Sequence, residues 1–221
     1  MMENNKYYQI KKFTFVGQLK SVDNLIQTKE GKRFLRLSLP IFDGVSTAYA
    51  EVFSFGLSDY IYATVNKKFE KINWSDRNSS RVLKGMNYND VYHLDLKEKK
   101  EFSNSYDLIK NFEELINEGF VTKDMRLKVV GDIEFQYYNG EVKPHYNIKS
   151  ISLPDKDAKD SLTIVESLLV EKESIKETDN GLEIDGYVVE YMKLDNESKK
   201  YPRLIEQHLT YPTDNKMVKK F

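Results

Sequence analysis

The sequence predicts a mainly β fold with one α-helix, and three observations carry this prediction. Three segments near the N-terminus alternate apolar and polar residues and are separated by short turns, as expected for antiparallel strands. A later segment, 105–120, repeats apolar residues at helical spacing and carries Gly119 near its end. A hairpin then follows around Asn139-Gly140, a dipeptide favoured in two-residue turns. Five strands are therefore expected, with a helix between the third and the fourth.

The expected elements, in chain order, are strands at 12–22, 33–42 and 46–55, a helix at 105–118 and a hairpin at 126–153. An insert at 56–100 separates the third strand from the helix. Within it, 57–72 is compatible with a short helix and 90–96 with a further strand. Gly17 and Gly131 interrupt otherwise regular strands, which indicates positions where the sheet bends.

The period-two pattern of the strands separates inward-facing from outward-facing residues. In the second strand three leucines alternate with Phe34 and Arg36, so the leucines are expected inside and Phe34 and Arg36 outside. In the third strand an aromatic set and a small set compete for the interior, and the pattern supports either. If the small set is buried, aromatic side chains line the outer surface. The residues concerned are Leu35, Leu37 and Leu39 in the second strand, and in the third Tyr49, Phe53 and Phe55 against Ala48, Ala50 and Val52.

The last third of the chain is expected to form separate elements. Residues 154–190 hold eleven acidic residues against four lysines, and 154–180 is predicted as an acidic helical linker. Residues 181–221 are predicted as a small C-terminal α/β extension, which we interpret as the start of a second domain that the chain does not complete. The first domain is expected to span 8–153.

Composition excludes several classes of chemistry. The 221 residues include no cysteine, which excludes disulfides, zinc ribbons and thiol catalysis. The three histidines, His93, His145 and His208, are not spaced as metal ligands, and no glycine-rich phosphate loop or nucleophile motif occurs. We therefore expect no enzyme, no metal and no cofactor. Since no apolar run reaches the length of a membrane span, a cytoplasmic protein without a membrane partner is expected.

The predicted hairpin resembles part of a known family. Residues 129–151 read VVGDIEFQYYNGEVKPHYNIKSI, with a glycine-bearing strand, aromatic residues around a polar-glycine turn and an apolar end to the return strand. This pattern resembles the last two strands of single-stranded-DNA-binding OB proteins. The order of elements over 8–153 is similar to that of SSB-like replication proteins of phages of low-GC bacteria. Two features depart from the family, because the insert at 56–100 is long and the acidic stretch is internal rather than terminal.

The resemblance implies a five-stranded OB barrel with an intervening helix. It implies a protein that binds single-stranded DNA, with RNA as the alternative, in DNA replication or recombination in the bacterial or host cytoplasm. Replication proteins are the partners that it implies.

In an OB fold, the face of strands two and three and the loops after strands one and four line the oligonucleotide groove. Aromatic side chains there stack on bases while cations meet phosphates. For some residues a structural role competes: Trp74 can plug the edge of a core, Phe34 can pack beneath the insert, and Tyr146 shares parity with the apolar Ile148. The candidate nucleic-acid-binding residues are Arg33, Phe34, Arg36, Tyr49, Phe53, Trp74, Arg77, Tyr137, Tyr138, Lys143 and Tyr146.

Charge is unevenly distributed, although the net charge is −1. Residues 1–36 hold eight basic and three acidic side chains, whereas 154–190 is strongly acidic. This contrast predicts that 155–179 acts as an internal mimic of DNA that covers the basic groove. The nearly neutral total also supports a different function, an OB module that binds proteins in a replisome or virion.

Overall fold

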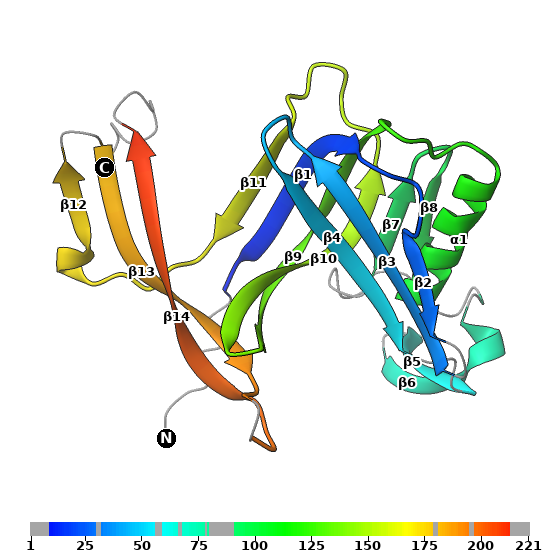
Figure 1. Ribbon diagram of the computed structural model, residues 1–221. Helices are drawn as coiled ribbons and strands as arrows, with labels where there is room; N and C mark the ends of the chain where they lie inside the picture. The colour runs from blue at the N-terminus through cyan, green and yellow to red at the C-terminus, as the bar shows by residue number, and fades with distance from the viewer. Residues whose placement is uncertain are drawn as a thin grey trace. The chain divides into compact units, whose positions relative to one another are not determined.

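The structure, a computed structural model, describes residues 9–29, 32–55, 59–65, 68–77, 79, 91–178, 181–194 and 197–212. Strands dominate these residues, which contain one α-helix, and the predicted mainly β fold is confirmed (Figure 1). The chain divides into two compact units. The ring unit comprises Lys12–Ile133 and His145–Ile164, and the C-terminal unit comprises Met1–Lys11, Glu134–Pro144 and Val165–Phe221.

The elements follow the chain in this order: β1 (Lys11–Leu19), β2 (Ile26–Lys29), β3 (Lys32–Phe42), β4 (Thr47–Phe55), β5 (Tyr60–Val65), β6 (Lys68–Asn73), the 3₁₀ turn η1 (Trp74–Asp76), β7 (Tyr92–Asp95), β8 (Lys99–Phe102), α1 (Ser105–Asn117), β9 (Arg126–Tyr138), β10 (Glu141–Ser152), β11 (Ser161–Glu166), the 3₁₀ turn η2 (Lys172–Ser174), β12 (Ile175–Thr178), β13 (Gly181–Met192) and β14 (Tyr201–Pro212).

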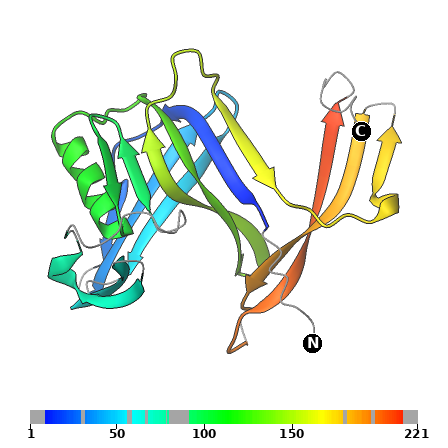
Figure 2. The same cartoon turned by 180° about the vertical axis from the view of Figure 1, so that it is seen from behind.

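Five strands of the ring unit follow one another in a closed order, β1-β3-β4-β10-β9 and back to β1 (Figures 1 and 2). Neighbours along β1, β3 and β4 are antiparallel, as are β1 and β9. Strand β10 instead runs parallel to β4, with Tyr146 opposite Ala50. The predicted pairing of the first strand with the hairpin is confirmed, since Phe13 lies opposite Gly131. A ring of five strands with α1 between its third and fourth members is the result.

The buried and outward faces of the strands agree with the leucine pattern of the second strand. They also show which residues of the third strand face inward. The three leucines of β3 are buried, and Phe34 and Arg36 face outward. In β4 the small set is inside, because Ala50 and Val52 are buried while the Tyr49 side chain is 60% exposed. Large side chains that are fully buried in the ring unit include Phe13, Phe15, Leu19, Leu37, Leu39, Ile41, Leu94, Leu108, Ile109, Phe112, Leu127 and Ile148.

Two glycines allow strands of the ring to approach each other closely. A Cβ atom on Gly131 would lie 1.8 Å from the carbonyl oxygen of Asn147, and one on Gly17 would lie 2.3 Å from that of Phe42. Both glycines were expected where the sheet bends, and the backbone contact gives the physical reason for their absent side chains.

The hairpin turn and the helix end as their sequences predict. Asn139 and Gly140 have φ of 53° and 85°, the positive pair of a type I′ turn. Helix α1 begins after Asn104, whose side chain accepts a hydrogen bond from the Asp107 N–H, and it is followed by Gly119 at φ 73°. One face of the helix packs against the ring through Leu108, Ile109, Phe112 and Leu115, which are buried.

Two helix predictions are wrong. The segment 57–72 contributes the antiparallel pair β5 and β6, and the acidic segment 154–180 contributes β11, η2 and β12. Both segments contain β-branched or aromatic runs, such as YIYATV and SLTIVE, which favour strand pairing over a helix. The strand predicted at 90–96 is confirmed as β7.

The C-terminal unit contains an antiparallel sheet in the order β12-β13-β14. Strands β13 and β14 pair along their whole length, from Gly181 opposite Pro212 to Met192 opposite Tyr201. Within this sheet the buried hydrophobic side chains are Val188 and Met192. Across the described residues of both units, no helix has the length and apolar character needed to span a membrane.

Candidate nucleic-acid interface

The outer surface of β3 and β4 brings together several of the predicted binding residues. Residues directly opposite each other on neighbouring antiparallel strands share a face. Arg36 lies opposite Phe53, and Pro40 lies opposite Tyr49. We call this surface the β3–β4 face, made of Phe34, Arg36, Ser38, Pro40 and Phe42 from β3, Tyr49, Glu51 and Phe53 from β4, and His145 from β10.

Aromatic side chains form a partly exposed cluster on the β3–β4 face. The rings of Phe34 and Phe53 have centroids 6.0 Å apart, and the His145 ring is centred 5.3 Å from Phe53. The guanidinium of Arg36 lies 5.5 Å from the Phe53 ring centre, within cation–π range. Tyr49 extends further into solvent. Flat ring faces at these positions are suited to stacking on planar ligands.

A carboxylate at the centre of the β3–β4 face organises its polar groups. Glu51 is only 8% exposed and forms an ion pair with Arg36. It also accepts a hydrogen bond from Ser38 Oγ at 2.9 Å, and His145 Nε2 lies 3.2 Å from its other oxygen. The carboxylate of Glu51 compensates the charge of Arg36. The ion pair also holds the guanidinium in a fixed position beside Phe53, so Arg36 is not an isolated cation.

A second cation lies at the opposite end of the β3–β4 face. The Lys20 ammonium is 3.8 Å from the ring centre of Phe42, the last residue of β3. Cation–π contacts at exposed sites contribute about 0.5–1 kcal/mol. The face therefore carries an aromatic residue beside a cation at two places, near the middle of β3 and at its last residue.

The hairpin tip belongs to the C-terminal unit. Tyr138 is 69% exposed, and Tyr137 is half-buried. The ammonium of the exposed Lys143 donates to Glu141 at 2.7 Å, which raises the pKa of Lys143 above its ordinary value. The tip therefore carries the two aromatic rings and the cation that the sequence predicted there. The β3–β4 face of the ring unit, as defined above, includes none of these three residues.

Tyr146 has a structural role, the alternative indicated by its shared strand parity with Ile148. Its ring meets the buried Phe13 edge-on, with centroids 5.2 Å apart. The preceding residue, His145, has the opposite parity and joins the β3–β4 face. Sequence reasoning missed both His145 and Glu51 as members of this surface. Strand parity relative to Ile148 could have identified His145, whereas nothing in the sequence distinguishes Glu51 from a solvated carboxylate.

Trp74 and Arg77 connect the insert to the start of α1. The Arg77 guanidinium donates to both carboxylate oxygens of Asp107, at 2.9 and 3.0 Å, and lies 4.3 Å from the Trp74 ring centre. The Trp74 ring contacts Tyr106 edge-on at 5.4 Å. This geometry supports the structural alternative for Trp74, and it gives Arg77 a structural ion pair that the sequence did not predict. The side chain of Arg33, also predicted to bind, lies outside the described residues, as does that of Phe55.

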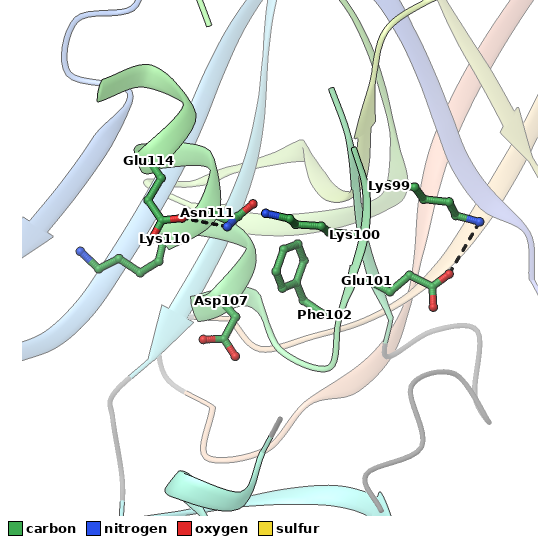
Figure 3. Close-up of a pocket in the computed structure, with 8 residues that line it drawn as sticks. All are labelled: Lys99, Lys100, Glu101, Phe102, Asp107, Lys110, Asn111 and Glu114. Carbon is green, nitrogen blue, oxygen red and sulfur yellow. Dashed lines mark hydrogen bonds and ion pairs between the residues drawn. The ribbon is translucent and has the colours of Figure 1, made fainter. Parts of the chain in front are cut away.

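A polar hollow with a volume of 660 Å³ lies between β8 and α1 (Figure 3). Lys100 and Phe102 extend from β8 toward Asp107 and Asn111 of the helix. Its charges are largely compensated, since Lys100 pairs with Glu98 outside the hollow and Asp107 pairs with Arg77. Among the described residues no cluster could hold a metal ion. The hollow therefore carries charges of both signs, several of which are paired.

Comparisons of the chain with models of protein families, with curated proteins and with solved structures find no match. The interpretation of the β3–β4 face consequently depends on its own geometry.

Proposed function

We propose that the ring unit is an OB fold that binds single-stranded nucleic acid, with single-stranded DNA in replication or recombination as its ligand. The observation that carries this proposal is the β3–β4 face, where exposed and half-exposed aromatic side chains surround a positioned arginine. No chemical step is part of the proposal, since binding requires only stacking and ion pairing.

The strand order supports the OB assignment. Strands β1, β3 and β4 form a meander, α1 follows, and β9 and β10 form a hairpin that returns to pair with both ends of the meander. This is the order of elements in the five-stranded Greek-key barrel. In such barrels the second and third strands carry the oligonucleotide on their outer face, and here these strands are β3 and β4.

Stacking supplies most of the expected affinity. Each base stacked on an aromatic side chain contributes about 1–3 kcal/mol, irrespective of base identity. Arg36 and Lys20 add cationic character next to the rings, and compensation of Arg36 by Glu51 limits the number of phosphates that the face neutralises. The salt dependence should therefore be shallow, with a slope of about −0.7 for each phosphate contact.

Tyr49→Ala is the sharpest test, because the side chain is too exposed to matter for folding. Binding of fluorescently labelled oligo-dT and oligo-rU should be measured by anisotropy at two salt concentrations. Loss of one stacking platform should weaken binding by about 1–3 kcal/mol with an unchanged salt slope. A matched control is Tyr191→Ala, which removes a 62% exposed tyrosine from the C-terminal sheet and should bind like the parent.

Tyr138→Ala then tests whether the hairpin tip belongs to the same binding surface. A loss similar to that of Tyr49→Ala would extend the surface to the tip, and parent-like binding would restrict it to the β3–β4 face. Lys143→Ala should reduce the salt slope by about 0.7 only in the first case. If the parent binds no single strand even at low salt, the proposal is wrong.

A protein-binding OB module is the second candidate. Two ion pairs favour it, because Arg36 with Glu51 and Lys143 with Glu141 leave little uncompensated positive charge for phosphates. Exposed apolar side chains in the C-terminal unit, including Leu169, Val170 and Leu204, also suit a protein partner. An absence of nucleic-acid binding together with co-purification of a stoichiometric protein would support this function.

A further inference from the structure

The outer edge of β14 is open. This strand is last in the order β12-β13-β14, so among the described residues only β13 pairs with it. Proline has no N–H and occurs where the backbone nitrogen faces away from the neighbouring strand. Pro202 and Pro212 both occupy even positions, and alternation along the ladder turns the N–H and C=O groups of the even residues from 204 to 210 toward the open edge.

Part of the sequence of this edge is symmetric about its centre. Residues 202–212 read PRLIEQHLTYP. Reversal about Gln207 places proline opposite proline and Ile205 opposite Leu209. Both of these apolar residues lie on the face of the sheet that contains the buried Val188. An antiparallel copy of the strand would therefore continue the same apolar face.

The polar side chains of the edge are complementary in the same register. Reversal about Gln207 places Glu206 opposite His208. Within one chain, His208 Nδ1 lies 2.7 Å from Asp185 Oδ1, and Nε2 lies 3.4 Å from the Thr210 hydroxyl. A carboxylate arriving from the opposite strand would meet the Nε2 side of the ring. A carboxylate opposite an imidazole avoids the like-charge repulsion that destabilises directly opposed residues of an antiparallel pair.

We propose that β14 pairs antiparallel with β14 of a second copy of this chain, with the two-fold axis at Gln207. Glu206 then exchanges both backbone hydrogen bonds with His208 of the partner subunit, and Leu204 does so with Thr210 of the partner subunit. The prolines at both ends stop the pairing, which makes the contact closed rather than fibre-forming. The result is one continuous sheet across two chains, independent of what the β3–β4 face binds.

Disulfide trapping tests the register, and the chain is suited to it because it contains no cysteine. At the two-fold axis the two Gln207 positions form a non-hydrogen-bonded pair, with Cα atoms about 4.5 Å apart. Disulfides form at Cα separations of about 4.4–6.8 Å. Full-length Gln207→Cys should therefore convert to a covalent dimer under mild oxidation.

Leu204→Cys is the matched control. The Leu204 side chain is 62% exposed and more accessible than Gln207, so random collisions would link it at least as readily. In the proposed register the two copies of residue 204 are about 20 Å apart, and no link should form within the dimer. Equal or faster cross-linking of Leu204→Cys would overturn the proposal.

Backbone chemistry supplies a second, independent test. Leu204→Pro removes an outward N–H without touching the ladder to β13, whereas Leu204→Thr keeps that N–H. Sedimentation equilibrium of the uncross-linked 26.0 kDa chain should show a dimer for the parent and for Leu204→Thr, and a monomer for Leu204→Pro. A parent that stays monomeric, or a Leu204→Pro variant that dimerises like the parent, would contradict pairing through this edge.

Discussion

The ring unit and the C-terminal sheet are built from the same kind of strand but differ in how much apolar surface they bury. The ring unit encloses a core of fully buried leucine, isoleucine and phenylalanine side chains, covered on one side by α1. The C-terminal sheet buries Val188 and Met192, while several of its large apolar side chains remain in solvent, such as Tyr191, Tyr201 and Leu204. A sheet with so small a core depends on something beyond its own three strands for stability.

This difference indicates a division of labour along the chain. The ring unit satisfies its own apolar surface, so its exposed β3–β4 face is available for a ligand. Among the described residues, the C-terminal sheet leaves an open strand edge and exposed apolar side chains, which are features of association surfaces. Two pairs of substitutions test whether stability is concentrated in the ring unit as the burial suggests, and a third pair tests a buried charge in the C-terminal unit.

The largest expected effect follows from Gly131→Ala. The added methyl would overlap the Asn147 carbonyl, and because backbone atoms of two ring strands cannot separate easily, the ring would have to open. We expect a loss above about 4 kcal/mol, or failure to fold. In the C-terminal sheet, Gly186→Ala would place its methyl 3.1 Å from a Val170 methyl and 3.2 Å from the Leu169 carbonyl oxygen, a much milder crowding than at Gly131. Urea unfolding should show a much smaller change for Gly186→Ala; comparable losses would remove the contrast.

Phe112→Ala should produce the next largest effect. This side chain is fully buried between α1 and the ring, and such truncations cost about 3–5 kcal/mol. Val188→Ala removes the most buried side chain of the C-terminal sheet but deletes less volume, so a loss of about 1–3 kcal/mol is expected. The two variants should be compared by urea midpoint at equal protein concentration. A greater loss for Val188→Ala would show that stability is not concentrated in the ring unit.

The smallest effect concerns Glu166 in the C-terminal unit. Burial raises the pKa of Glu166 above its ordinary value of 4.5; Lys11 opposes this rise and Glu190 adds to it. One carboxylate oxygen of Glu166 is buried without a hydrogen-bond partner. A carboxyl whose pKa is raised by folding favours the folded state below its ordinary pKa, and this contribution is lost as the pH rises through the folded value.

Glu166→Gln should therefore raise the thermal midpoint at pH 7, where the parent carries a poorly solvated charge. The gain should disappear below about pH 4, where the parent is protonated. Exposed Glu173, substituted in the same way, should show no such pH-dependent gain. A stabilisation of Glu166→Gln that persists unchanged at low pH would assign the effect to packing instead of charge.

Much of the ring unit could be predicted from the sequence, because its local patterns and its tertiary pairing agree. The alternating leucines of β3, the spacing in α1 and the Asn139-Gly140 turn each specify one local structure. The segments 57–72 and 154–180 could not be predicted correctly. Their β-branched and aromatic residues favour strands over helices, and β11 in addition pairs with β1, which is remote in the chain.

The candidate site was only partly predictable for a related reason. Outward parity correctly placed Phe34 and Arg36 on one face, whereas the pattern left open which side Phe53 occupies. It could not reveal that Glu51 would neutralise Arg36, since that depends on cross-strand distance and burial. The role of Arg77 likewise depends on Asp107, which approaches it only after the insert folds against α1.

The parallel pairing of β4 with β10 has a consequence for how quickly the protein reaches its native state. Ala50 and Tyr146 are roughly a hundred residues apart in the chain, and no contact between them forms until the intervening insert, helix and β9 are in place. Chains dominated by such distant pairings fold in about milliseconds to seconds, far more slowly than helical bundles. During synthesis, β1, β3 and β4 must wait for β9 and β10 to emerge from the ribosome. The aromatic face that later suits a ligand is therefore exposed first as an open sheet, when it is most vulnerable to aggregation.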